Sequence, residues 1–143
     1  RFGFNSQFTS IFARAEGGAP GLDHIGLLDA HLTYAILRGE HGRLRLEGGL
    51  SSAFAPDIIF VGPDVGTSAA MGIAGPVGAE ASLHLTPYPY VQVDGYAGLT
   101  LTLGPAGLRA GWRHVYLNDR GLVDGVVNAD TFSGPFLGLS LSM

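Results

Sequence analysis

A strict alternation of apolar and polar residues is the feature that most constrains how this chain can fold. Successive side chains point to opposite faces in a β-strand, whereas in a helix every third or fourth side chain shares a face. The alternation is clearest in Leu28–Leu37, Arg43–Leu50, Val77–Leu85 and Val91–Leu103. It predicts an all-β protein in which each strand has one apolar and one polar face.

Tight-turn signals divide the alternating segments. Three Gly-x-x-Gly tetrapeptides, at Gly39–Gly42, Gly75–Gly78 and Gly104–Gly107, suit tight turns. Longer connections, predicted at 16–23, 56–66 and 118–130, alternate with them, and a compact one lies at 86–89. The predicted strands lie at about 2–15, 24–38, 43–55, 67–74, 77–86, 90–103, 107–118 and 131–143. A meander with its tight turns at one end and its loops at the other is typical of outer-membrane barrels.

The polar faces favour a barrel that is polar inside and apolar outside. Only 14% of the residues are charged, against roughly 25% in soluble domains, and every basic residue is an arginine. The arginines on these faces, four in number, match four acids, as buried charges require. We therefore predict an interior polar network of Asp29, His31, Arg43, Arg45, Glu47, Glu80, His84, Asp94, Arg109 and Arg113.

The apolar faces suit lipid. Aromatic residues lie near several strand ends, where a membrane barrel carries its aromatic girdles: Phe12, Phe54, Tyr90, Trp112 and Tyr116. The residues predicted to face lipid are Leu32, Leu46, Leu83, Val93, Leu101 and Trp112. Together these patterns predict an eight-stranded antiparallel up-and-down transmembrane β-barrel, formed as a single domain by residues 1–143.

The last predicted strand carries a family resemblance. In Phe132–Met143, the residues Leu137, Leu139, Leu141 and Met143 alternate up to the end of the sequence. In this strand and in overall architecture the chain resembles the small eight-stranded bacterial outer-membrane barrels of the outer membrane protein A/X type. The resemblance implies a protein of the bacterial outer membrane, in contact with membrane lipid and lipopolysaccharide.

The function expected of such a barrel is structural. An interior filled by side chains leaves no open pore, so we expect anchoring, or binding of a protein partner through loops 56–66 and 118–130. The alternative is a soluble lipocalin-like β-barrel that binds an apolar ligand, with the same strands turned inside out. A net charge of −4 and dispersed arginines argue against nucleic acid as a partner.

An enzymatic alternative is a lipid-modifying acyl hydrolase or acyltransferase of the outer membrane. Its candidate residues are His114 and Ser133, a base and a nucleophile that fall near the base of one loop. Pairing Leu117 with Phe132 places His114 across from Pro135, with Ser133 diagonal to it.

No cofactor or metal site is predicted. The chain has no cysteine, and the acids Asp119, Asp124 and Asp130 match no calcium-binding motif.

Overall fold

Eight antiparallel strands in chain order form one sheet in the computed structural model. The structure describes residues 2–14, 22–39, 42–55, 58–122 and 125–141. The strands are β1 (Phe2–Arg14), β2 (Leu22–Arg38), β3 (Gly42–Ala55), β4 (Ile58–Ala74), β5 (Val77–Thr86), β6 (Val91–Leu103), β7 (Ala106–Asn118) and β8 (Ala129–Leu141). The predicted up-and-down all-β fold is confirmed, and no described residue forms a helix that could span a bilayer.

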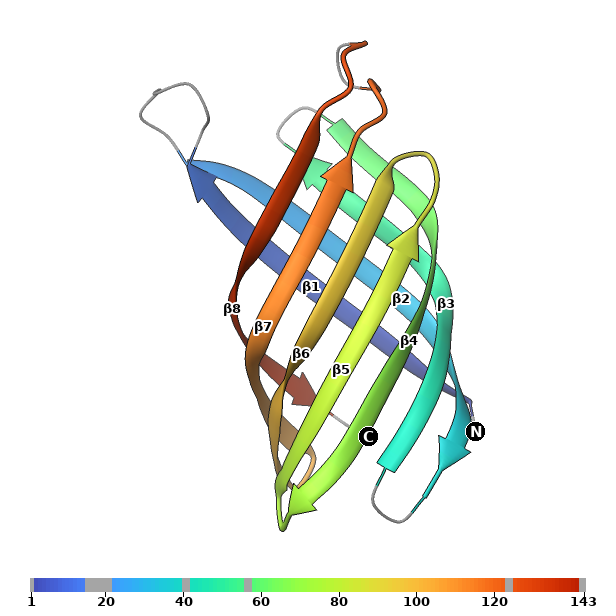
Figure 1. Ribbon diagram of the computed structural model, residues 1–143, viewed down its shortest axis with the longest axis vertical. Coiled ribbons are helices and arrows are strands. Elements are labelled where there is room, and N and C mark those ends of the chain that lie inside the picture. The colour runs from blue at the N-terminus through green and yellow to red at the C-terminus, as the bar shows by residue number, and fades with distance from the viewer. Residues whose placement is uncertain (1, 15–21, 40–41, 56–57, 123–124, 142–143) are drawn as a thin grey trace.

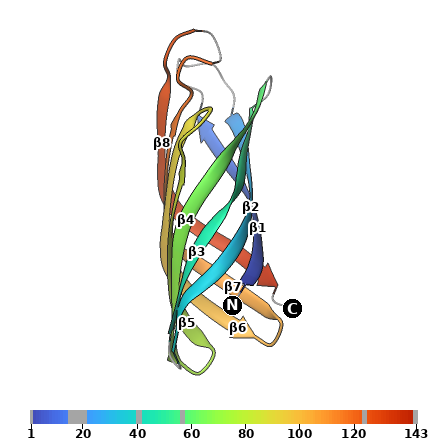
Figure 2. The same cartoon turned by 90° about the vertical axis from the view of Figure 1, so that its right-hand side faces the viewer.

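The sheet is strongly curled, so that β1 and β2 lie behind β6, β7 and β8 (Figure 1). A view from the side shows the same two walls (Figure 2). The pairing runs from β1 to β8, and the described residues of these two strands do not pair with each other. The predicted closed barrel is therefore wrong in this respect. A closed barrel requires pairing of β1 with β8, the two strands farthest apart in the chain. Strand β8 contains Gly134, Pro135 and Gly138, and such residues weaken strand pairing.

The fourth strand is longer than predicted. Its bounds, Ile58–Ala74, include most of the segment 56–66 that was assigned to a loop. Pro63 pairs with Leu50 within a continuous register, so this proline does not end the strand. Gly75 and Gly104, in two of the predicted tight turns, have positive φ, at 52° and 64°, a conformation that glycine adopts readily.

The curl gives the sheet two different faces. On the face toward the enclosed space, here the inner face, an apolar cluster lies toward the loop end: Leu27, Ala53, Tyr90 and Val115, packed against Phe60, Leu117 and Phe132. Tyr90 was predicted for an aromatic girdle, but its side chain is buried in this cluster. Polar residues follow toward the turn end, including buried Asp29, His31, Glu47, Asp64, Asp94 and Arg113.

Candidate functional site

Two arginine–carboxylate pairs fix the inner face. Arg109–Glu80 lies toward the tight turns, and Arg113–Asp94 lies level with His84, which pairs with Asp94 in the strand register. Arg113 Nε donates to both oxygens of Asp94, at 2.9 and 3.1 Å, and its Nη2 donates to Asp94 as well. Arg109 Nε donates to Glu80, and its guanidinium lies 5.2 Å from the centre of the Tyr96 ring. These pairs join β6 to β7 and β5 to β7, so they tie the wall of the curl together.

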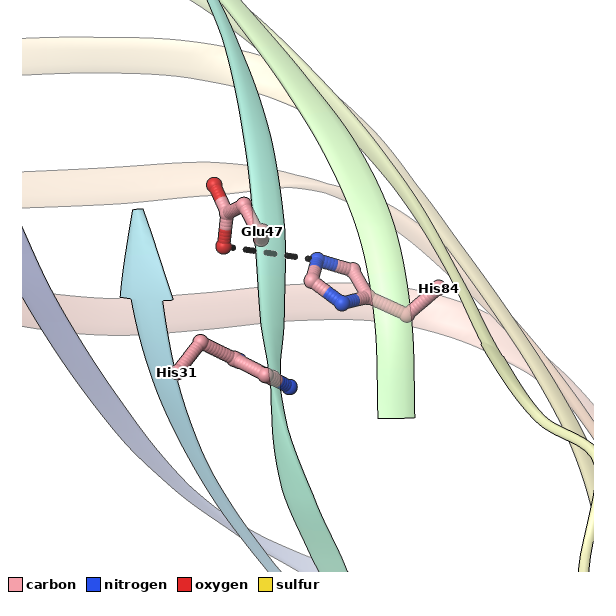
Figure 3. Close-up of side chains that lie close together, drawn as sticks. All are labelled: His31, Glu47 and His84. Atoms are coloured by element: carbon pink, nitrogen blue, oxygen red, sulfur yellow. Dashed lines mark ion pairs between the residues drawn. The ribbon is translucent and has the colours of Figure 1, made fainter. Parts of the chain in front are cut away.

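A cluster of histidines and carboxylates occupies the middle of the inner face. His31 Nε2 lies 2.7 Å from Asp64 Oδ1, and His84 Nδ1 lies 2.9 Å from the same oxygen. His84 Nε2 lies 3.7 Å from Glu47 Oε2. The two imidazole rings are 4.7 Å apart. Figure 3 shows the rings and the Glu47 carboxylate converging from different strands. We call His31, Glu47, Asp64 and His84 the histidine cluster.

Glycines in the strand register explain why these side chains meet. Gly49 pairs with His31 on one side and with Asp64 on the other. Gly66 pairs in the same way with Glu47 and His84. A Cβ at Gly66 would overlap the His84 ring, and one at Gly49 would overlap the backbone of Ala30 and His31. Gly66 therefore leaves the space that the His84 ring occupies, and Gly49 allows the backbone of β2 to approach closely.

Asp64 is the functional residue that the sequence analysis missed. It was placed in a loop, yet its side chain is only 2% exposed and accepts hydrogen bonds from His84 and, at 2.9 Å, from Thr86 Oγ1. The missed signal is its position on the chain: Asp64 shares a face with Gly66 and Ser68, while Val61 and Val65 share the opposite one. Extending the alternation past Pro63 would have found it.

Most of the predicted interior residues do lie on the inner face. Asp29, His31, Glu47, Asp94 and Arg113 are buried, whereas Arg45, Glu80, His84 and Arg109 are partly buried. Ser51 donates to Asp29 at 2.5 Å. Arg43 differs, because its side chain is exposed at the start of β3. It lies at the end of the curl, where water reaches the guanidinium.

The residues predicted to face lipid lie on the other face, here the outer face. The exposed fractions are 70% for Leu32, 53% for Leu46, 55% for Leu83 and 57% for Trp112. Val93 and Leu101 are partly exposed. These leucines do not pack together around a central axis.

The strand register of the two candidate catalytic residues differs from the predicted one. Ser133 lies directly across from His114, and Trp112 lies across from Pro135. The predicted pairing was wrong by two residues, because β8 begins at Ala129. The Ser133 hydroxyl accepts a hydrogen bond from Trp112 Nε1 at 2.8 Å. Both His114 and Ser133 are exposed on the outer face.

The connection between β7 and β8 is organised by Asp119. Its carboxylate accepts hydrogen bonds from the backbone N–H groups of Gly121 and Asn128, both at 2.8 Å. Asp130 is exposed in β8, and Asp124 lies outside the described residues. Asp119 and Asp130 therefore have different environments.

Comparison with protein-family models, curated proteins and solved structures finds no match to the chain.

Proposed function

We propose that the chain is an integral protein of a bacterial outer membrane, anchored by a sheet whose outer face lies in lipid. The observation that carries the proposal is the inversion of the two faces. Charged and hydrogen-bonded side chains are buried on the inner face, while large apolar side chains are exposed on the outer face. In water this arrangement exposes large apolar side chains from all eight strands, and soluble monomers rarely expose extended apolar surfaces. In lipid an apolar outer face is the expected arrangement.

The outer face is apolar over nearly the whole sheet. Exposed apolar side chains come from all eight strands, among them Phe4, Leu32, Leu50, Val65, Leu83, Leu99, Trp112 and Leu139. Burial of apolar area is worth roughly 25 cal/mol per Å², so a surface of this extent favours transfer into a bilayer. The role that fits a filled, charged interior is anchoring or partner binding, since such an interior holds no channel.

The two alternatives have less support. A lipocalin-like barrel needs an apolar interior for its ligand, whereas the described inner face is mostly polar between its apolar cluster and its tight-turn end. A lipid-modifying enzyme needs a base that contacts the nucleophile. The Ser133 hydroxyl accepts a hydrogen bond from Trp112, and an indole N–H is a donor without basicity.

Site-directed spin labelling tests the proposal. Because the chain lacks cysteine, single cysteines can be placed at Leu83 and Leu99 on the outer face and, as matched controls, at Ser82 and Thr100, their neighbours on the inner face. In lipid vesicles we expect the two outer labels to be accessible to oxygen and protected from a water-soluble nickel chelate. The inner labels should lack this lipid signature. Equal access of the nickel chelate to Leu83 and Ser82 would contradict the proposal.

A simpler test distinguishes the membrane protein from the soluble alternative. The protein in lipid should require detergent for extraction and should migrate differently on gels before and after boiling. A chain that purifies from the membrane-free fraction in plain buffer, as a monomer, would refute membrane anchoring.

A further inference from the structure

We propose that the histidine cluster binds a divalent transition-metal ion, with Zn²⁺ as the ion that fits it best. One ligand atom from each of His31, Glu47 and His84 lies within 4.8 Å of the others, and the three side chains point toward one another (Figure 3). Zinc ligands lie about 2.0–2.2 Å from the ion. Ligand atoms on one zinc ion are therefore somewhat closer to one another than 4.8 Å. Small side-chain rotations would bring them into range.

Two of the ligand atoms are buried without a hydrogen bond of ordinary geometry. His31 Nε2 and Glu47 Oε2 are buried, and neither has a hydrogen-bond partner among the described residues. His31 Nε2 does lie 2.7 Å from Asp64, but this contact lacks the geometry of a hydrogen bond. Buried polar atoms are nearly always satisfied in folded proteins. A cation between these two atoms would satisfy both.

Asp64 holds one of the rings as a metal site requires. His84 Nδ1 is 2.9 Å from Asp64 Oδ1, and the other nitrogen of the ring, Nε2, faces Glu47. A histidine that donates one N–H to a carboxylate and offers its second nitrogen to the metal is the usual arrangement around bound zinc. Thr86 in turn donates to the second oxygen of Asp64, which fixes the carboxylate.

The charge of the inner face also favours a bound cation. Among its described side chains that are buried or partly buried, the carboxylates are Asp29, Glu47, Asp64, Glu80 and Asp94, and the guanidinium groups are Arg45, Arg109 and Arg113; Arg38 and Arg43 are exposed at the tight-turn end. The ion pairs of Glu80 and Asp94 are made to arginines, but those of Asp64 and Glu47 are made to histidines. A divalent ion beside two neutral imidazoles balances the charges of Asp64 and Glu47.

The donor set distinguishes zinc from the hard cations. Imidazole nitrogen with carboxylate oxygen suits zinc and its transition-metal neighbours. Calcium and magnesium prefer shells made of oxygen. This inference does not depend on the proposed membrane location, since all its ligands lie on the inner face. Failure of one proposal therefore leaves the other intact.

Zinc binding by the folded chain tests the inference. After equilibrium dialysis against Zn²⁺ and removal of excess metal, elemental analysis should find an equimolar amount of zinc, and the Tm should rise with Zn²⁺ but not with Ca²⁺. Co²⁺ in place of Zn²⁺ should give the intense visible absorption of a low-coordinate site. A wild-type chain that is folded by circular dichroism and retains no zinc would overturn the inference.

Matched variants locate the site. Glu47→Gln and His31→Asn should each lower zinc affinity at least tenfold, and Asp64→Asn should lower it about 10- to 100-fold, the range typical of the residues that orient a ligand. His114→Asn is the control, because it removes an exposed histidine on the outer face. Zinc binding lost in His114→Asn but kept in Glu47→Gln would place the metal elsewhere. If a cluster variant does not fold, the wild-type Co²⁺ spectrum decides, and the spectrum of a fully hydrated ion would count against the site.

Discussion

The two arginine–carboxylate pairs differ in burial, and this difference predicts different energies. The side chains of Arg113 and Asp94 are 8% and 9% exposed, whereas those of Arg109 and Glu80 are 22% and 17% exposed. Removal of one charge from a buried pair leaves the other uncompensated, at a cost of roughly 3–5 kcal/mol. Asp94→Asn should therefore lower the free energy of unfolding by about that amount, and Glu80→Gln by about 1 kcal/mol. Denaturant titration of the two variants measures both, and equal losses would contradict the prediction.

Substitution of Gly66 by alanine tests how tightly the histidine cluster is packed, because it adds a single methyl group. A Cβ added there would overlap the His84 ring, and forcing extra atoms into a packed site costs about 1–3 kcal/mol. Gly66→Ala should be destabilising by this amount. Gly72→Ala on the same strand is the control, because a Cβ there has nothing within 4 Å. Its unfolding free energy should stay within about 0.5 kcal/mol of the wild-type value. A Gly66→Ala variant as stable as Gly72→Ala would show that the ring has room.

Among the elements, the β7–β8 connection should lose its structure in acid. Hydrogen bonds from Asn128 and Gly121 to the carboxylate hold the pKa of Asp119 below its ordinary value. Because the pKa is lower in the folded connection, the contribution of Asp119 is complete above its ordinary pKa of about 3.9 and is lost as the pH falls through the folded value. The amide signal of Asn128, followed by NMR, should change with a midpoint below the ordinary pKa. Asp119→Asn should abolish this transition, and a wild-type midpoint at or above the ordinary value would contradict it.

Strand β4 shows how far the sequence determines the elements. Alternation located the other strands to within a few residues, because each has one apolar and one polar face. In β4 the first half contains Gly62, Pro63 and Gly66, residues that usually mark loops. Two of these residues are glycines because of close neighbours from other parts of the chain. Gly62 lies against the backbone of Tyr88, and Gly66 lies beneath the His84 ring. The loop-like residues of this half therefore obscured the alternation of Asp64 with Gly66 and Ser68, so both the first half of β4 and Asp64 were missed.

The sequence pattern also could not predict which side chains on the inner face contact one another. Alternation assigned Asp94, Arg113, Glu80 and Arg109 to one face, and the structure pairs them. It could not show that His31 and His84 meet at one carboxylate, because that contact depends on how rows of residues align across β2, β4 and β5. The register error at His114 and Ser133 has the same origin. A slip of two residues keeps every side chain on its face and leaves the pattern unchanged.

For the whole molecule, the two edge strands β1 and β8, whose described residues do not pair with each other, give the most demanding prediction. Backbone N–H and C=O groups without partners in the hydrocarbon region cost several kcal/mol each, so a sheet anchored in lipid must pair these two strands. Hydrogen–deuterium exchange in lipid bilayers should therefore protect the amides of β1 and β8 as strongly as those of β6, which has partners on both sides. In plain buffer or denaturing detergent this protection should disappear from the two edge strands first. Rapid exchange of β1 and β8 in lipid, beside a protected β6, would mean that the sheet stays open and that membrane anchoring of this form is untenable.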